Sequence, residues 1–146
     1  MFDFHEAFSR NLGWITADEQ NLLRRSRIAV GGLGGTGGDH VITLTRLGIG
    51  AFNIADFDTF DIVNFNRQAG AMMSTVGKPK ADVISSMAKD INPELEVQVF
   101  SEGITPQNVD SFFRGVDVYV DALDYFAFDA RQLVYKRLAE LKIPAV

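Results

Sequence analysis

The sequence predicts an α/β protein whose Rossmann-like, mostly parallel sheet is covered by helices on both faces. Apolar runs of strand length recur at residues 27–31, 51–55, 95–100 and 116–120. Segments with the apolar spacing of helices lie between these runs and after the last one, at about 41–47, 79–91, 106–115 and 128–141. Strands that alternate with helices in this way favour a parallel sheet packed on both sides.

The chain begins with a predicted helical lead-in segment, residues 1–26. Within it, Thr16 followed by Glu19 forms a capping-box pattern, which is typical of a helix start. A length of 146 residues fits a single domain, so we interpret 1–146 as one unit. Residues 143–146 resemble the beginning of a further strand. We therefore expect the sheet to be truncated at its C-terminal side and the chain to be the N-terminal part of a longer protein.

Composition argues against several classes of function. Cysteine is absent, which removes disulfides, thiolate nucleophiles and cysteine zinc sites. The two histidines, His5 and His40, are too far apart in sequence to form a metal site by themselves. A net charge of −5 argues against a general nucleic-acid surface, because neutralising phosphates needs a basic face. The apolar runs are too short to cross a bilayer and no secretion signal opens the chain, so we expect a cytoplasmic protein without nucleic-acid or membrane partners.

A glycine-rich segment follows the first predicted strand and opens the next helix. Gly32, Gly34 and Gly37 have the spacing Gly-x-Gly-x-x-Gly in the context that a dinucleotide fingerprint requires. The first glycine allows a tight turn, the second lets backbone N–H groups approach a phosphate, and the third lets the helix pack close to the strand. Asp56 ends the second strand, where a carboxylate can accept hydrogen bonds from ribose hydroxyls. The pattern favours a nucleotide site over a glycine-rich turn beside an unrelated Asp, but it leaves NAD, a methyl donor and ATP open.

The loop after Asp56 favours ATP. It contains Arg67, and Lys80 follows at the start of the next helix. A guanidinium can hold phosphate oxygens in bidentate fashion and an ammonium adds a point charge, whereas a nicotinamide needs an apolar floor. A lone Lys or Arg is usually a solvated surface charge, so it is the combination of the two with the glycine loop that points to a triphosphate.

These motifs belong to a longer ordered series. After the glycine loop come Asp-x-Asp at 56–58, Asn-x-x-Arg-Gln at 64–68, Val-Gly-x-x-Lys at 76–80, and Asp124 after the fourth predicted strand. The series resembles the adenylation domain of the ThiF/MoeB/HesA family, which includes the ubiquitin-activating enzymes, over about residues 8–146. The motifs in this order are far more specific than the glycine loop alone.

The resemblance implies ATP and Mg²⁺ as ligands and a role for each motif. It also implies a homodimer, because Arg10 aligns with an arginine that reaches the nucleotide of the partner subunit in this family. The implied sites are the phosphate turn (Gly32, Gly34, Gly35 and Gly37), the ribose-binding Asp56, the neighbouring nucleotide-binding residues Asp58 and Asn64, the triphosphate cations Arg67 and Lys80, and the magnesium ligand Asp124.

The activity that the resemblance implies is adenylation of a carboxylate, with the C-terminus of a ubiquitin-like or sulfur-carrier protein as the expected acceptor. A carboxylate is ionised at pH 7 and needs no general base, so catalysis would consist of alignment and charge stabilisation by Arg67, Lys80, Asp124 with its Mg²⁺, and Arg10. Removing one such cation should cost about 2–4 kcal/mol of transition-state stabilisation.

The sequence departs from the family pattern at Tyr125, where many members have Asn. The family's downstream cysteines are also absent, and we expect most of the acceptor-binding surface to lie outside residues 1–146, so that this part alone could be inactive. Two other functions remain open: a non-catalytic Rossmann-like partner subunit and an NAD-binding oxidoreductase domain. The first would not need to retain the basic residues, and the second would bind dinucleotide without magnesium.

Overall fold

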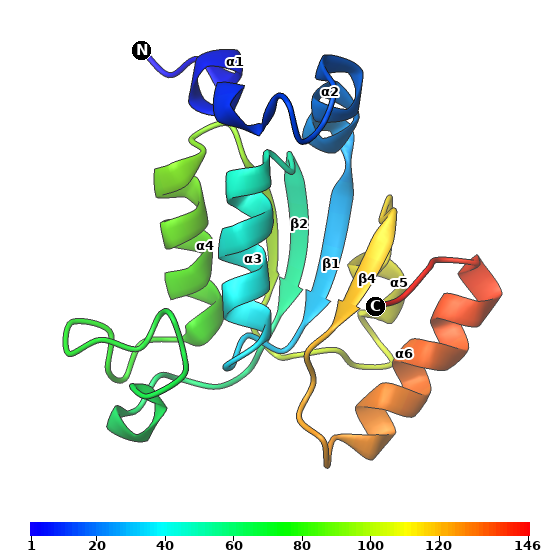
Figure 1. Cartoon of the computed structure of the whole chain (residues 1–146). Helices are drawn as coiled ribbons and strands as arrows, with labels where there is room; N and C mark the ends of the chain where they lie inside the picture. Colours follow the sequence, from blue (N-terminus) through cyan, green and yellow to red (C-terminus); the bar gives the residue numbers. More distant parts are fainter.

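A four-stranded parallel sheet forms the centre of the computed structural model, which describes residues 1–146 (Figure 1). The strand order is β3-β2-β1-β4, and every neighbouring pair is parallel. This confirms the predicted Rossmann-like α/β class. The strands are β1 (Arg27–Gly31), β2 (Ala51–Ala55), β3 (Glu96–Phe100) and β4 (Val118–Asp121).

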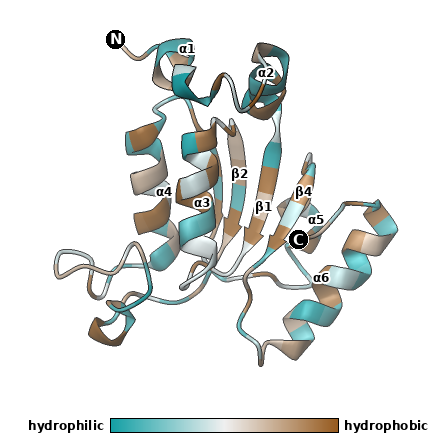
Figure 2. Ribbon diagram, in the orientation of Figure 1, coloured by the Kyte–Doolittle hydropathy of each residue, from teal (hydrophilic) through white to brown (hydrophobic).

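Helices cover both faces of the sheet, each over its own apolar cluster. On one face, α3 (Gly37–Leu47) and α4 (Lys80–Ile91) pack on side chains such as Ile28, Val30 and Phe52. On the other, α5 (Val109–Phe112) and α6 (Phe128–Leu141) pack around Ala29 and Tyr119. Successive residues of a strand point to opposite faces, so the near-continuous apolar run of β1 supplies both clusters. Figure 2 shows hydrophobic residues along the strands between these helices.

The helix ends follow the capping signals in the sequence. Thr16 Oγ1 accepts the N–H of Glu19, and the Glu19 carboxylate accepts the N–H of Thr16 at 2.7 Å, so the predicted capping box opens α2 (Ala17–Arg25). The N–H and the hydroxyl of Thr16, which both donate to the Glu19 carboxylate, lower the pKa of Glu19. Helix α3 ends at Gly48, whose φ of +94° is a conformation that glycine adopts without a steric cost.

Several predicted boundaries differ from the structure, among them those of α5 and β4. Helix α5 covers only residues 109–112 of the expected 106–115, because the side chain of Asn108 accepts the N–H of Thr105 at 2.8 Å and holds the preceding residues in a turn. The fourth strand begins at Val118 rather than at 116. At the chain end, the N–H of Tyr119 donates to the carbonyl of Pro144, and the N–H of Val146 donates to the carbonyl of Tyr119. Residues 144–146 therefore pair with β4, where a further strand was expected.

The lead-in segment lies across the amino ends of the strands. It consists of α1 (Phe4–Ala7), a 3-10 turn η1 (Ser9–Asn11) and α2. The side chain of Asn11 donates to the carbonyl of Leu47 at 3.1 Å, at the last residue of α3. Crossing a bilayer would take a longer apolar helix than any in this structure.

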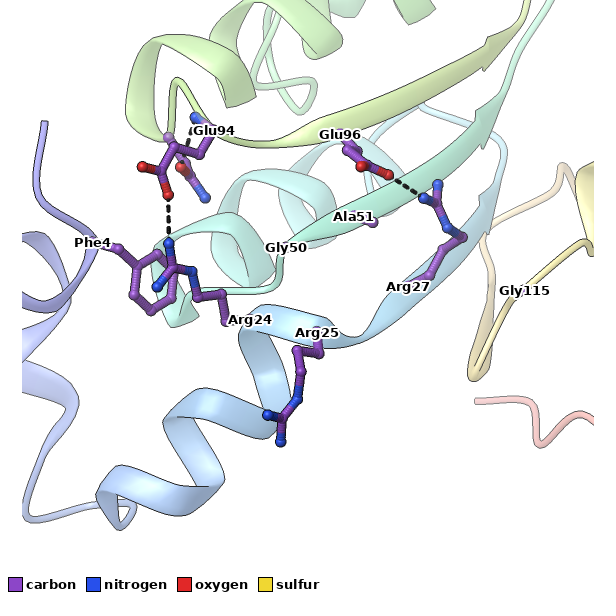
Figure 3. A pocket seen from close by; sticks show the side chains of 10 residues that line it. Phe4, Arg24, Arg25, Arg27, Gly50, Ala51, Glu94, Glu96 and Gly115 are labelled. Atoms are coloured by element: carbon purple, nitrogen blue, oxygen red, sulfur yellow. Dashed lines mark hydrogen bonds and ion pairs between the residues drawn. The ribbon is translucent and has the colours of Figure 1, made fainter.

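A cavity of about 400 Å³ lies under the lead-in segment (Figure 3). Arg24 pairs with Glu94 at 2.9 Å and stacks its guanidinium over the ring of Phe4. Arg27 pairs with Glu96. Both pairs join the α2–β1 segment to the β3 side of the sheet.

Candidate active site

The glycine loop connects the carboxyl end of β1 to α3. Gly32 has a φ of +85°, and a Cβ there would run into the backbone carbonyl of Ala122. A Cβ on Gly37 would overlap the carbonyl oxygen of Gly32. These two glycines therefore provide the tight turn and the close helix packing that the spacing predicts. A Cβ on Gly34 would meet only the amide nitrogen of Gln68 at 3.6 Å, an ordinary contact, so no steric demand within the chain requires glycine there.

The loop opens into a cavity of about 430 Å³ at the carboxyl ends of β1, β2 and β4. This is the point where the strand order reverses, since β2 lies on one side of β1 and β4 on the other. Open parallel sheets bind their ligands at this switch point. The lining residues are Gly32, Gly34, Gly35, Thr36, Asp56, Asp58, Asn64, Arg67, Gln68, Lys80, Ala122, Leu123 and Asp124.

Asp56 ties the glycine loop to the end of β2. Its Oδ2 accepts the N–H of Leu33 at 2.6 Å, and its Oδ1 accepts the N–H of Asp58 at 2.8 Å. Each carboxylate oxygen has a second lone pair, so both can still accept a hydrogen bond from a ligand hydroxyl. The carboxylate thus fixes the glycine turn and faces the cavity.

Two cations line the cavity in different settings. Arg67 is exposed, and its Nη1 donates to the carbonyl of Val63 and to Oδ1 of Asn66. Lys80, the first residue of α4, is buried, and its Nζ lies 3.1 Å from Oδ2 of Asp58. The structure thus brings Arg67 and Lys80 to one cavity, as the motif order predicts.

Asn64 and Gln68 are buried polar residues in the wall of the cavity. Oδ1 of Asn64 accepts the N–H of Asp61 at 2.9 Å, which caps the short turn η2 (Ile62–Asn64). Oε1 of Gln68 is buried and has no hydrogen-bond partner within the chain. An unpaired buried polar atom is costly, so this oxygen identifies Gln68 as a candidate ligand-contacting residue. Sequence reasoning did not single out Gln68 or Thr36, although Gln68 directly follows Arg67 in the motif.

Asp124 follows β4 and completes the wall. Its Oδ1 accepts the N–H of Phe126 at 2.9 Å in a local turn. The structure contains no group of three or more His, Cys, Asp or Glu residues that could hold a metal by themselves. Mg²⁺ is commonly held by one or two carboxylates together with substrate phosphates, so a single carboxylate facing a phosphate turn fits that donor set.

Asp121, which sequence reasoning missed, anchors the segment that carries Asp124. Its carboxylate accepts the hydroxyls of Tyr135 at 3.0 Å and Tyr119 at 3.3 Å, and it accepts the N–H of Leu123 at 3.2 Å. Arg131 of α6 pairs with the same carboxylate at 3.4 Å. Burial, followed by the nearby Asp121 charge, raises the pKa of Tyr119, so this hydroxyl stays protonated as a donor.

A smaller apolar cavity of about 140 Å³ adjoins the main one. Both cavities share Gly32, Asp56, Asp58, Leu123 and Asp124. The apolar part of the side cavity is formed by Ala55, Phe57, Ile104, Leu123, Ala127 and Ala130.

Comparison with known proteins identifies the family of this chain. Residues 8–146 match the ThiF family. The chain belongs to the ThiF family.

Among the ThiF relatives, the tRNA threonylcarbamoyladenosine dehydratase of Bacillus subtilis is 39% identical over 122 residues, which is 83% of this chain and 48% of that protein. The enzyme of the same name from Haemophilus influenzae is 36% identical over 129 residues, covering 88% of this chain and 49% of that protein. The crystal structure of the E. coli enzyme TcdA in complex with ATP has a TM-score of 0.90 at 30% identity, over 97% of this chain and 58% of that one. The chain therefore spans about half the length of the relatives it matches.

One residue that the ThiF resemblance implies does not reach the cavity. Arg10 lies in η1, next to Asn11, which contacts the last residue of α3. The glycine loop lies at the first residue of that helix, and 11 residues of helix span about 16 Å. Arg10 is thus at the opposite end of the sheet from its own chain's cavity.

Proposed function

We propose that this ThiF-family chain binds ATP with Mg²⁺ and activates a carboxylate by adenylating it. The observation that carries the proposal is the composition of one cavity at the switch point of the sheet. A glycine turn, two basic side chains and the exposed carboxylate of Asp124 all face the same space. A cavity with these groups suits a polyphosphate, because helix amino ends and backbone N–H groups bind anions.

The shape of the two adjoining cavities supports one orientation of the nucleotide. The apolar side cavity, with Phe57 and Ile104 in its wall, suits the adenine ring. Asp56 lies on the border between the two cavities, where it would accept ribose hydroxyls. The triphosphate would then extend over the glycine turn toward Arg67 and Lys80.

The charges of the cavity also support a requirement for Mg²⁺. The wall contains three carboxylates, Asp56, Asp58 and Asp124, but only two basic residues, Arg67 and Lys80. A triphosphate would add further negative charge, so binding needs an extra cation. Asp124 is the residue proposed to hold Mg²⁺, which would supply charge neutralisation between the phosphates and the acidic wall.

The chemistry requires no general base. An oxygen of the acceptor carboxylate attacks the α-phosphorus, an acyl–phosphate bond forms, and the bond to the bridging oxygen breaks with its electron pair leaving on pyrophosphate. Arg67 and Lys80 would stabilise the negative charge that accumulates on that leaving group. Preorganised cations in a partly dry cavity are suited to this task because they need no reorientation during the step.

Arg10 would act on a second copy of the chain. Its distance from its own cavity leaves the cavity of a partner subunit as the place where it could contact a nucleotide. We therefore retain the homodimer as part of the proposal.

For the acceptor, the relatives favour a carboxylate carried on tRNA. This replaces the expectation of no nucleic-acid partner that was drawn from the net charge of −5. The enzymes with 36–39% identity are named for threonylcarbamoyladenosine, a nucleoside whose threonyl group has a carboxylate. Adenylation followed by an internal attack that displaces AMP would remove the elements of water, which agrees with the name dehydratase. The related E. coli structure with AMP agrees with this product. A sulfur-carrier C-terminus, the acceptor expected from the sequence, is the alternative, because a 33% identical Mycobacterium tuberculosis relative is named as a probable adenylyltransferase/sulfurtransferase.

The test is ATP–pyrophosphate exchange by the full-length protein with tRNA bearing threonylcarbamoyladenosine, with a sulfur-carrier protein, and without an acceptor. We expect exchange with the tRNA, and its loss in Asp124→Ala but not in Asp129→Ala, an exposed carboxylate in the first turn of α6. If exchange occurs with the carrier protein and not with the tRNA, the proposed acceptor is wrong but the proposed adenylation chemistry stands. Tight NAD binding without exchange would contradict the proposal.

A further inference from the structure

Lys80 is a cation with almost no access to water. Only 8% of its side chain is exposed, and its Nζ lies 3.1 Å from Oδ2 of Asp58. A buried ammonium is unfavourable unless it is paired, because burial removes its hydration. In the ligand-free protein, Asp58 is the carboxylate that provides this pairing.

The backbone of Asp58 is held independently of its carboxylate. Its N–H donates to Oδ1 of Asp56 at 2.8 Å, and its carbonyl accepts the N–H of Lys80 at 2.9 Å. By contrast, 54% of the Asp58 side chain is exposed. The carboxylate can therefore turn from Lys80 into water without breaking either backbone bond.

A phosphate and the Asp58 carboxylate would compete for the same ammonium. Both are anions, both suit the donor geometry of Nζ, and Asp58 already lies within hydrogen-bond distance of it. A phosphate that approaches Lys80 must either displace Asp58 or lie beside its negative charge. Either event weakens phosphate binding relative to a cavity without that carboxylate.

We propose that Asp58 is the resident counter-ion of Lys80 and a negative regulator of polyphosphate affinity, rather than a ligand of the nucleotide. It stabilises the buried ammonium between catalytic cycles, opposes over-tight binding of ATP, and favours release of pyrophosphate by returning to Lys80. This role rests on the proposed function to the extent that the ligand near Lys80 is a polyphosphate. It revises the expectation from the sequence, which placed Asp58 among the nucleotide-binding residues.

The proposal predicts a gain of affinity when the Asp58 charge is removed. In calorimetry on the full chain, Asp58→Asn should bind ATP and pyrophosphate about tenfold more tightly, the scale expected for one partly exposed charge a few ångströms away. Adenosine, which has no phosphate, should bind both proteins equally. Asp82→Asn is the matched control, since it removes an exposed carboxylate from the first turn of the same helix outside the cavity and should change none of the three affinities.

Other outcomes would overturn the proposal. Weaker ATP binding by Asp58→Asn only when Mg²⁺ is present would make Asp58 a metal ligand. Equal weakening for ATP and adenosine would mean that Asp58 shapes the cavity or contacts the nucleoside. Unchanged affinity for pyrophosphate would show that Asp58 does not compete for Lys80.

A ligand-free measurement keeps the pairing testable if Asp58→Asn is poorly folded. Asp58→Asn leaves a buried ammonium unpaired and should lower Tm by about 3–6 °C. Adding Lys80→Met removes that ammonium, so the double variant should be as stable as Lys80→Met alone. Additive losses in Tm would contradict the pairing.

The outcomes for the two proposals are separable. A chain that binds ATP but supports no pyrophosphate exchange with any acceptor would count against adenylation and leave the counter-ion role intact. A chain that exchanges pyrophosphate but shows no gain of affinity in Asp58→Asn would overturn the counter-ion role alone.

Discussion

The two ends of the sheet hold cavities of nearly equal volume, about 430 Å³ at the carboxyl end and 400 Å³ at the amino end. Both are polar and both contain arginine, so size and composition do not separate them. They differ in how fully their polar groups are paired within the chain. That difference supports the carboxyl end as the proposed ligand site.

At the amino end, the protein itself supplies charged partners for two of the three arginines that line the cavity, whereas the exposed Arg25 has none. Arg24 and Arg27 each pair with a glutamate from another element (Figure 3). Arg27 also donates to the buried Oδ1 of Asn53 at 3.0 Å. Arg25 is turned away from both pairs in this view. The ion pairs that line this cavity connect the lead-in helix α2 and the start of β1 to the β3 side of the sheet.

At the carboxyl end, polar capacity is left unused. Oε1 of Gln68 is buried and has no hydrogen-bond partner. The exposed Arg67 bonds to the Val63 carbonyl and to Asn66 but has no carboxylate partner. Buried polar groups are normally satisfied, so the unpaired oxygen of Gln68 supports a ligand contact in this cavity. The comparison predicts that substitutions at one end change ligand binding and those at the other change stability.

The largest expected effect is at Arg67. Arg67→Ala should reduce kcat/KM for ATP in pyrophosphate exchange by about 10²–10³-fold, because one preorganised positive group is lost from the transition state. Its exposed side chain predicts little change in Tm. Arg25→Ala, an exposed arginine beside the other cavity, is the control and should retain full exchange. Equal losses in the two variants would remove the distinction between the two ends.

Within the glycine loop, two substitutions should separate folding from binding. Gly37→Ala forces a Cβ against the carbonyl of Gly32 and should cost about 1–3 kcal/mol of unfolding free energy. Gly34→Ala meets only the flexible amide of Gln68, so stability should be nearly unchanged while ATP affinity falls. Urea denaturation and calorimetry on both variants measure the two effects. Normal ATP affinity in Gly34→Ala would mean that no phosphate approaches that residue.

At the amino end, Arg27 should matter for stability alone. Arg27→Met leaves the buried Asn53 oxygen without its donor and should cost about 1–3 kcal/mol in urea denaturation, with ATP affinity unchanged. Glu96→Gln is the matched variant, because it removes only the exposed half of the network and keeps the Asn53 bond. A loss in Glu96→Gln as large as the loss in Arg27→Met would place the stabilisation in the ion pair instead, because Arg27→Met removes both interactions.

The sequence predicted most of the fold because its elements are marked by local signals. β1 and β2 have the expected bounds, since each is an apolar run that ends at a glycine or an aspartate. The start of α5 was predicted too early, because the side chain of Asn108 competes with the helix for the local backbone. Propensity and periodicity do not report that competition.

The candidate site was predicted in part for the same reason. The order of the motifs predicted that the glycine loop, Arg67 and Lys80 lie in one cavity, as they do. The prediction worked because the carboxyl ends of parallel strands lie at one edge of the sheet. The pairing of Lys80 with Asp58 and the binding of Arg131 to Asp121 were not predicted. Each is a choice of one partner among many charged residues, and that choice depends on the packed geometry rather than on spacing.

The smallest expected effect is the loss of unfolding free energy on substitution of Arg24. Its pair with Glu94 is 41% and 49% exposed, so Arg24→Ala should lose only about 0.5–1 kcal/mol, shared between the ion pair and the stacking on Phe4. Salt screens exposed charges, so the loss should shrink in urea denaturation at high salt, whereas the loss in Arg27→Met should persist because Asn53 is buried. If the losses in Arg24→Ala and Arg27→Met fell equally with salt, both would arise from exposed charges at the amino end of the sheet. The two cavities would then differ in how exposed their polar groups are, and not in whether those groups are paired.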